Sequence, residues 1–191
     1  MSIAIIVLAA GGSSRLGRTK QLVRVGGSSL LRHAAEAAQG SSADDTLVVL
    51  GSDADRLTRE LDGLEVTLVR NSGWQEGIAS SIRAGVRVLP EAAEAALLML
   101  CDQPRVSTGL LDTIMSRHRA VPASIVASWY ADTIGVPALF PKTYFQELLS
   151  LKGDRGAKQI IERHRSNTVT IPFPDGTIDI DTQDDLERVE E

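Results

Sequence analysis

The sequence predicts an α/β fold in which one mostly parallel sheet has helices on both faces. Apolar runs rich in β-branched residues alternate with capped, amphipathic segments from residue 3 to the end of the chain. No linker, repeat or low-complexity segment interrupts this alternation. The 191 residues are 43% hydrophobic, which is enough for one sizeable core. We therefore predict a single domain covering residues 1–191.

The predicted strands are short, nearly continuous apolar runs, as expected for strands that are buried on both faces. The first of them leads directly into a glycine-rich loop. The last is weaker and only alternates in polarity, which is also typical of a strand. In chain order, the predicted strands are 3–8, 46–50, 66–69, 95–101, 124–127, 136–140, 168–171 and 177–181.

The predicted helices begin at residues that can cap a helix or end at a helix breaker. Ser28 or Ser29 caps the first helix, Asp53 caps the second, and Pro90 ends the third. In chain order, the predicted helices are 29–38, 53–61, 77–89, 107–119, 142–149, 157–164 and 182–191.

The topology alone indicates where a ligand binds. In open α/β sheets, ligands lie beyond the carboxyl ends of the strands. The candidate segments are therefore those that follow predicted strands, at 9–20, 70–81, 102–105 and 128–137.

Composition excludes several classes of protein. A net charge of −5 argues against bulk nucleic-acid binding, and 4% aromatic residues argue against base stacking on single strands. The longest apolar runs, 3–10 and 95–101, fall short of the roughly 18 residues of a membrane helix. We expect a cytoplasmic protein with neither nucleic acid nor membrane as a partner.

The cysteine and histidine residues indicate no separate chemistry. Cys101 is the only cysteine, so an intramolecular disulfide is impossible. We predict that it packs inside the protein and is not a nucleophile, because nothing nearby in the sequence lowers its pKa. His33, His118 and His164 lie on predicted helices without metal-ligand spacing, and we expect them at the surface.

Charge is unevenly distributed along the chain. Residues 1–40 hold five basic residues and one acid, whereas residues 175–191 hold eight acids and one base. Three of the five basic residues lie between Arg15 and Lys20, in the loop after the first strand. A basic loop at this position is suited to binding one phosphate-rich ligand.

That loop combines small residues with positive charge. The backbone N–H groups of Gly11 to Ser14 can cradle phosphate oxygens, and Arg15 and Lys20 add fixed charge at the same place. The loop is neither the Gly-x-Gly-x-x-Gly dinucleotide fingerprint nor a P-loop. We interpret it as a phosphate-binding loop; the alternative is an ordinary surface turn.

Polar residues also follow two other strands. Asp102 comes directly after a buried strand, where one carboxylate can be enough to bind Mg²⁺, since this ion keeps water and substrate phosphate as further ligands. The alternative is an aspartate that opens a turn before Pro104. Asn71 and Ser81 offer donors and acceptors for a base or ribose, or they belong to a loop and helix cap. Trp74 between them is predicted to pack against the core.

Three further aspartates are candidates for a functional role, and each also has a structural explanation. Asp154 lies in a Gly-Asp-x-Gly turn, near the start of the predicted helix 157–164, and could cap it. Asp179 and Asp181 alternate along the predicted strand 177–181, so both would face the same side. The later acids are explained by the start of the last helix.

The first loop resembles the signature loop of the nucleotidyltransferases that act on sugars, isoprenoid precursors and the molybdenum cofactor. The matching residues are Leu8, Ala9, Ala10, Gly11, Ser13, Arg15, Gly17 and Lys20. Within that superfamily, the sequence resembles the molybdenum cofactor cytidylyltransferases. The further matches occur in the family's order at 71–81, 102–104, 135–137, 151–157 and 179–182. The segment 130–132 departs from the family's pattern, which has a glycine two residues after its tyrosine.

The resemblance implies a Rossmann-like fold of the nucleotide-diphospho-sugar transferase type. It also implies transfer of CMP from CTP to a molybdopterin-type cofactor, with release of pyrophosphate and with Mg²⁺, or Mn²⁺ in its place, as the cofactor. A molybdenum-dependent oxidoreductase or its chaperone would receive the product.

The resemblance also implies roles for individual residues. The implied catalytic residues are Arg15, Lys20 and Asp102. The implied nucleotide-binding residues are Leu8, Ala9, Ala10, Gly11, Gly12, Ser13, Asn71 and Ser81. The implied metal ligands are Asp102 and Asp179, and the implied acceptor-binding residues are Gly135, Pro137 and Asp154.

Three further functions compete with this interpretation. The first is a cytidylyl- or uridylyltransferase that acts on a sugar or isoprenoid phosphate. The second is a molybdenum cofactor carrier without catalytic activity. The third, a nicotinamide-dependent oxidoreductase, is disfavoured because the dinucleotide fingerprint is missing.

Overall fold

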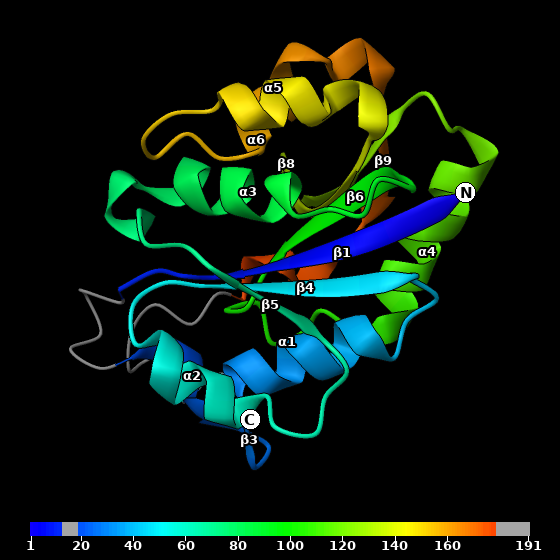
Figure 1. The fold of residues 1–191 in the computed structure, drawn as a ribbon. Coiled ribbons are helices and arrows are strands. Elements are labelled where there is room, and N and C mark those ends of the chain that lie inside the picture. Colours follow the sequence, from blue (N-terminus) through cyan, green and yellow to red (C-terminus); the bar gives the residue numbers. More distant parts are fainter. Residues whose placement is uncertain (13–18, 179–191) are drawn as a thin grey trace.

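A computed structural model describes residues 1–12 and 19–178 of the chain (Figure 1). The described residues form a seven-stranded sheet in the order β5-β4-β1-β6-β8-β7-β9. Its strands are β1 Ser2–Ala9, β4 Asp45–Leu50, β5 Thr67–Arg70, β6 Ala93–Leu100, β7 Ile125–Tyr130, β8 Thr133–Pro141 and β9 Thr168–Pro172. A small antiparallel ribbon joins β2 Arg24–Val25 to β3 Ser28–Ser29. The predicted mostly parallel sheet is confirmed.

Helices cover both faces of the sheet, as predicted (Figure 1). The helices α1 Leu30–Gln39, α2 Ala54–Glu60 and α4 Thr108–Ala120 contribute to one apolar core. The helices α3 Ile78–Arg87, α5 Phe145–Ser150 and α6 Lys158–Arg163 contribute to the other. Residues 3 to 8 of β1 alternate between these two cores. This arrangement explains why the strand is apolar without interruption.

The strand β8 is the exception to the parallel arrangement. It runs antiparallel to both β6 and β7. The connection from β7 to β8 is the pair Ala131 and Asp132, with φ angles of 44° and 55°. Two successive residues with positive φ are typical of a tight hairpin turn. The chain therefore returns at once beside β7, instead of crossing over through a helix.

Of the predicted helix caps, the one at Ser29 is confirmed and the one at Asp53 is wrong. Ser107 also caps its helix, and the capping alternative for Asp154 is not borne out. The hydroxyls of Ser29 and Ser107 accept hydrogen bonds from the backbone N–H of the third residue after each, both at 3.3 Å. Asp53 is left-handed, with φ of 56°, and its carboxylate accepts a hydrogen bond from the Thr19 hydroxyl at 2.5 Å instead of capping α2. Asp154 does not cap α6, because that helix begins after Ala157 without a side-chain cap.

The predicted strand at 177–181 does not begin where expected. Residues Pro174–Thr177 form a 3-10 turn, and residues 179–181 lie outside the described part of the chain, as does the predicted helix 182–191. In the ranges 1–12 and 19–178, no helix is long and apolar enough to cross a bilayer.

The expectation that all three histidines lie at the surface is wrong for His118. His33 is exposed, but His118, on the buried face of α4, is only 1% exposed. Its Nδ1 atom has no hydrogen-bond partner among the described residues. Burial lowers the pKa of His118, and nearby Arg119 adds to this effect, whereas the Ser124 backbone and Glu94 oppose it.

We expect His118 to make the fold less stable in mild acid. Because the folded state favours the neutral ring, the unfolded chain binds more protons once the pH falls below the ordinary pKa of histidine. The free energy of unfolding should therefore decrease as the pH falls from about 7 to about 5. Urea unfolding at both pH values measures it.

The variants His118→Gln and His33→Gln separate this effect from general acid sensitivity. Glutamine does not titrate, so His118→Gln should show a smaller loss of stability between the two pH values. The exposed His33 serves as the control, and His33→Gln should keep the wild-type pH dependence. An unchanged pH dependence in His118→Gln would refute the role of His118.

Candidate nucleotide-binding site

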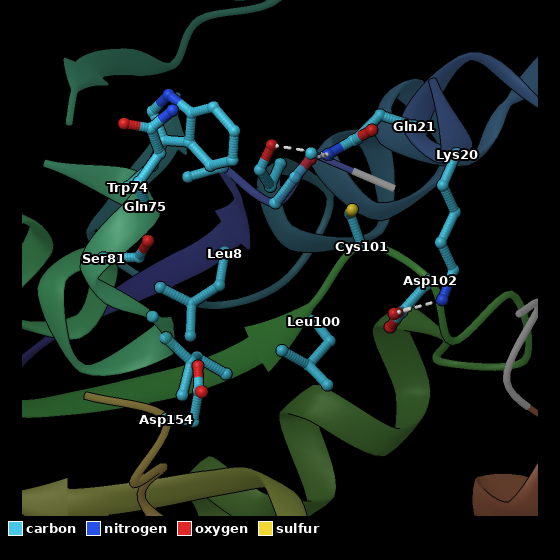
Figure 2. A pocket seen from close by; sticks show the side chains of 16 residues that line it. Leu8, Lys20, Gln21, Trp74, Gln75, Ser81, Leu100, Cys101, Asp102 and Asp154 are labelled. Carbon is cyan, nitrogen blue, oxygen red and sulfur yellow. Dashed lines mark hydrogen bonds and ion pairs between the residues drawn. The ribbon is translucent and has the colours of Figure 1, made fainter. Parts of the chain in front are cut away.

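A cavity of about 470 Å³ lies at the carboxyl ends of β1 and β6 (Figure 2). Its walls come from the loop after β1, the segment from Trp74 to Ser81, the turn after β6, and the connection between α5 and α6. This volume lies in the range of small-molecule sites. The cavity thus occupies the sheet edge that the topology predicts.

The loop after β1 forms the first wall, and a buried amide holds it in place. Leu8, Ala9, Ala10, Gly11 and Gly12 all line the cavity. The Gln21 side chain, which is 3% exposed, donates hydrogen bonds to the carbonyl oxygens of residues 9 and 11 at 3.0 and 2.7 Å. Sequence reasoning missed Gln21, since nothing in one sequence distinguishes an amide that braces a loop from a surface glutamine.

Several predicted site residues lie outside the described part of the chain. They are Ser13 and Arg15 in the first loop, and Asp179 and Asp181 near the end. Their predicted roles stay predictions.

Lys20 and Asp102 meet on one side of the cavity (Figure 2). The ammonium of Lys20 and Oδ2 of Asp102 are 2.7 Å apart, and their side chains are 12% and 23% exposed. The sequence separates these residues by 82 positions, and the adjacent strands β1 and β6 bring them together. The basic loop and the carboxylate, each of which follows a strand, thus meet at the sheet edge that the topology predicts.

The second carboxylate oxygen of Asp102 fits a metal ligand. Oδ1 is buried and has no hydrogen-bond partner among the described residues. A carboxylate oxygen is the ligand that Mg²⁺ and Mn²⁺ prefer, and Mg²⁺ commonly uses one or two protein carboxylates plus water and phosphate. Within residues 1–12 and 19–178, no cluster of three or more metal-ligating side chains exists.

The segment from Trp74 to Ser81 forms the second wall, and Ser81 lines the cavity as predicted. Asn71 does not line it. The Asn71 amide donates to the hydroxyls of Ser80 and Ser81, at 2.8 and 3.1 Å, and its oxygen accepts from the backbone N–H of Gly73 at 3.0 Å. Asn71 is 8% exposed and orients this wall from behind.

Trp74 joins the two walls. As predicted, it packs against the core, and it also lines the cavity. A Cβ atom on Gly12 would lie 2.7 Å from the indole ring, and one on Gly51 would lie 2.6 Å from the carbonyl oxygen of Ala10 and 2.7 Å from Trp74 Cβ. The lack of side chains at these two positions lets the first loop and Trp74 come together.

Of the three predicted acceptor-binding residues, only Asp154 lines the cavity. Gly135 and Pro137 lie on β8 and are not among the lining residues. The carbonyl oxygen of Pro137 accepts a hydrogen bond from the Ser128 hydroxyl at 2.8 Å. Both residues lie near the amino end of β8. Because β8 is antiparallel to β6, that end lies at the same edge of the sheet as the carboxyl end of β6.

Cys101 lines the cavity but is not suited to nucleophilic chemistry. Its side chain is 5% exposed. Burial, followed by the neighbouring negative charge of Asp102, raises the pKa of the thiol far above its usual value. The thiolate is therefore not populated near neutral pH, and the prediction of buried packing is confirmed.

The fold and this cavity define an α/β domain of the nucleotidyltransferase type. The sequence matches the family model described as MobA-like NTP transferase domain over residues 5–168. Because that match spans most of the 191 residues, the chain belongs to this family.

Curated relatives carry several different names. The chain is 28% identical to the bifunctional protein GlmU of Corynebacterium diphtheriae, over 65% of this chain and 27% of that protein. It is 30% identical to nicotine blue oxidoreductase of Paenarthrobacter nicotinovorans, over 66% and 61%. It is 24% identical to a probable molybdenum cofactor guanylyltransferase of a Nostoc species, over 97% and 89%. The chain thus spans less than two thirds of the length of the first two relatives.

Two solved structures resemble almost the whole chain. One is a homolog of Mycobacterium tuberculosis Rv0371c from Mycobacterium sp. strain JC1, with 34% identity and a TM-score of 0.83 over 98% of this chain and 94% of that one. The other is a complex of Rv0371c from Mycobacterium tuberculosis with manganese, with 29% identity and a TM-score of 0.79 over 99% and 98%.

We expect Gly51→Ala to destabilise the protein, because its Cβ would overlap both the Ala10 carbonyl and Trp74. Overpacking of this kind costs about 1–3 kcal/mol in the free energy of unfolding. Gly109→Ala is the matched control, since the nearest atom to its Cβ would be 3.9 Å away and the residue lies in α4. It should be neutral or stabilising by up to about 1 kcal/mol. Urea unfolding measures both, and equal stabilities would contradict the close packing at Gly51.

Proposed function

We propose that the protein is a divalent-metal-dependent nucleotidyltransferase that transfers CMP from CTP to a molybdopterin-type molybdenum cofactor and releases pyrophosphate. The observation that carries this proposal is the Lys20–Asp102 pair beside the glycine amides of the first loop, with the second oxygen of Asp102 left for another ligand. Membership of the MobA-like NTP transferase family supports it.

The reaction needs no nucleophile from the protein. An oxygen of the acceptor's phosphate monoester attacks the α-phosphorus of CTP, the bond from that phosphorus to the bridging oxygen breaks, and pyrophosphate leaves. The protein has to align the two phosphates and to stabilise the charge that develops. Lys20 and the amides of Gly11 and Gly12 would do this, with Arg15 as a further cation in the proposal.

Asp102 would hold a magnesium or manganese ion, and Asp179 would be the second ligand. Such an ion, when bound, would supply positive charge beside the phosphates and act as a Lewis acid on the reacting phosphoryl group. The manganese in the related Rv0371c structure supports this part of the proposal. On the protein side, Gln21 keeps the first loop in position and Asn71 orients Ser81.

The choice of substrate has separate support. The resemblance of the ordered motifs to cytidylyltransferases supports CTP. The relative named as a molybdenum cofactor guanylyltransferase supports a molybdenum cofactor as the acceptor. In this proposal the acceptor lies near Gly135 and Pro137, and a molybdenum-dependent oxidoreductase or its chaperone receives the product in the cytoplasm.

One observation favours a second function. A relative at 30% identity is named nicotine blue oxidoreductase. Oxidation of NADH or NADPH, followed by absorbance with candidate electron acceptors, tests this second function directly. The acceptor that is used distinguishes transfer to a sugar or isoprenoid phosphate from the main proposal. Pyrophosphate release distinguishes the main proposal from carriage of the molybdenum cofactor without catalysis.

A pyrophosphate-release screen tests the main proposal. Each of CTP, GTP, UTP and ATP is combined with the molybdenum cofactor or with a panel of small phosphates, in Mg²⁺ or Mn²⁺. We expect release with CTP and the molybdenum cofactor. Faster release with GTP for every acceptor would rule out cytidylyl transfer, and cofactor binding without release would favour a carrier.

We expect Asp102→Asn and Lys20→Met each to lower the turnover number for pyrophosphate release by about 10²–10³-fold. Each removes one fixed charge from the phosphates or the metal, and contacts of this kind are worth that much in rate. Asp62→Asn is the control, because Asp62 is an exposed aspartate that does not line the cavity. Near-normal turnover in Asp102→Asn would exclude the proposed role of Asp102.

A further inference from the structure

The cavity contains a second carboxylate, that of Asp154, and its surroundings differ from those of Asp102. Asp102 pairs with Lys20. Asp154 is exposed to the cavity and makes no hydrogen bond or ion pair with any residue in the described ranges. Figure 2 shows the two carboxylates well apart in the cavity, with Leu100 between them.

The position of Asp154 is fixed by its contact with the start of α3. A Cβ on Gly77 would overlap Asp154 Oδ1 and would lie 2.5 Å from the Gly153 carbonyl oxygen. That carbonyl accepts a hydrogen bond from the backbone N–H of Ala79 at 3.1 Å. Gly77 has φ of 99°, which favours glycine. The connection between α5 and α6 therefore packs directly against the first turn of α3.

Arg83 holds the same connection from farther along α3. Its guanidinium donates to the carbonyl oxygen of Leu151 at 2.7 Å and to the Glu76 carboxylate at 2.7 Å. One side chain thus ties together the segment that carries Asp154 and the segment that carries Trp74 and Gln75. Asp154 is exposed, but the backbone just before it is anchored at Leu151 and Gly153.

Ser81 lies on the same face of α3, one turn after Gly77. Its hydroxyl oxygen accepts a hydrogen bond from the Asn71 amide at 3.1 Å. In the described part of the chain, no residue accepts the hydroxyl hydrogen of Ser81. This end of the cavity therefore offers a donor from Ser81 and an acceptor from Asp154.

The charges assign the two ends of the cavity to different parts of a nucleotide. Phosphates belong beside Lys20 and the glycine amides, because the Asp154 carboxylate would repel them. The base then extends toward Ser81 and Asp154, past the apolar side chains of Leu8, Ile78 and Leu100. An aspartate can accept a hydrogen bond from an exocyclic amino group.

We propose that Asp154 accepts a hydrogen bond from the exocyclic amino group of cytosine and thereby selects CTP over UTP. This inference rests on the proposed function. Cytosine presents an amino donor beside the N3 acceptor, which complements Asp154 and Ser81. Uracil presents a carbonyl acceptor beside an N3–H donor, so its carbonyl would face the carboxylate, and both groups would remain without a hydrogen bond.

Equilibrium binding of CTP and of UTP, measured by calorimetry in Mn²⁺, tests the role of Asp154 without requiring catalysis. We expect the wild-type protein to bind CTP about tenfold or more tightly than UTP. In Asp154→Asn, the amide can donate to the uracil carbonyl, so CTP affinity should fall, UTP affinity should rise, and the ratio should approach one. Asp62→Asn is the matched control and should keep the wild-type ratio.

Three outcomes would overturn the inference: equal affinities of the wild type for the two nucleotides, no binding of either, or an unchanged ratio in Asp154→Asn. Pyrophosphate release measured on the same samples separates this inference from the proposed function. Release with an unchanged ratio would refute only the role of Asp154. A CTP preference that depends on Asp154, without release for any acceptor, would support that role and count against transfer.

Discussion

The parallel pairing of β1 with β6 is the constraint on which the site depends. The two strands stay in register up to the pair Leu8 and Leu100, and the N–H of Cys101 still donates to the Leu8 carbonyl at 3.3 Å. The loops that follow therefore leave the sheet at the same level. A basic loop from the start of the chain and a carboxylate from its middle consequently face one another, although neither segment alone resembles a complete site.

Much of this arrangement could be predicted because buried strands have a recognisable apolar sequence. The central strands are buried on both faces, so they read as continuous apolar runs, and the topology then indicates the ligand edge. Helix caps are harder to predict. Ser29 and Ser107 cap their helices, but Asp53 and Asp154 do not, because a short polar side chain can instead satisfy a distant group or face a cavity.

What the sequence could not reveal depends on contacts between distant segments. Gln21 and Arg83 hold loops together by hydrogen bonds, and Gly51 leaves room for two segments to meet. The partners of all three come together only when the strands have paired. The burial of His118 is hidden for a similar reason, since a single polar residue within an amphipathic helix does not indicate which face it occupies. The antiparallel return of β8 depends on a hairpin without a glycine or asparagine signal.

The contact between Lys20 and Asp102 also has a consequence for how charge enters the cavity. Each group already neutralises the other, at 2.7 Å and with little exposure. A lone cation that approaches Asp102 is attracted less strongly, because the ammonium of Lys20 already offsets part of the carboxylate's charge. In the same way, Asp102 weakens the attraction of Lys20 for a lone phosphate. A ligand that carries both a metal ion and a phosphate can replace the Lys20–Asp102 contact with one contact to each residue at the same time. The cavity is thereby matched to a metal–nucleotide complex arriving as one unit, more than to either ion alone.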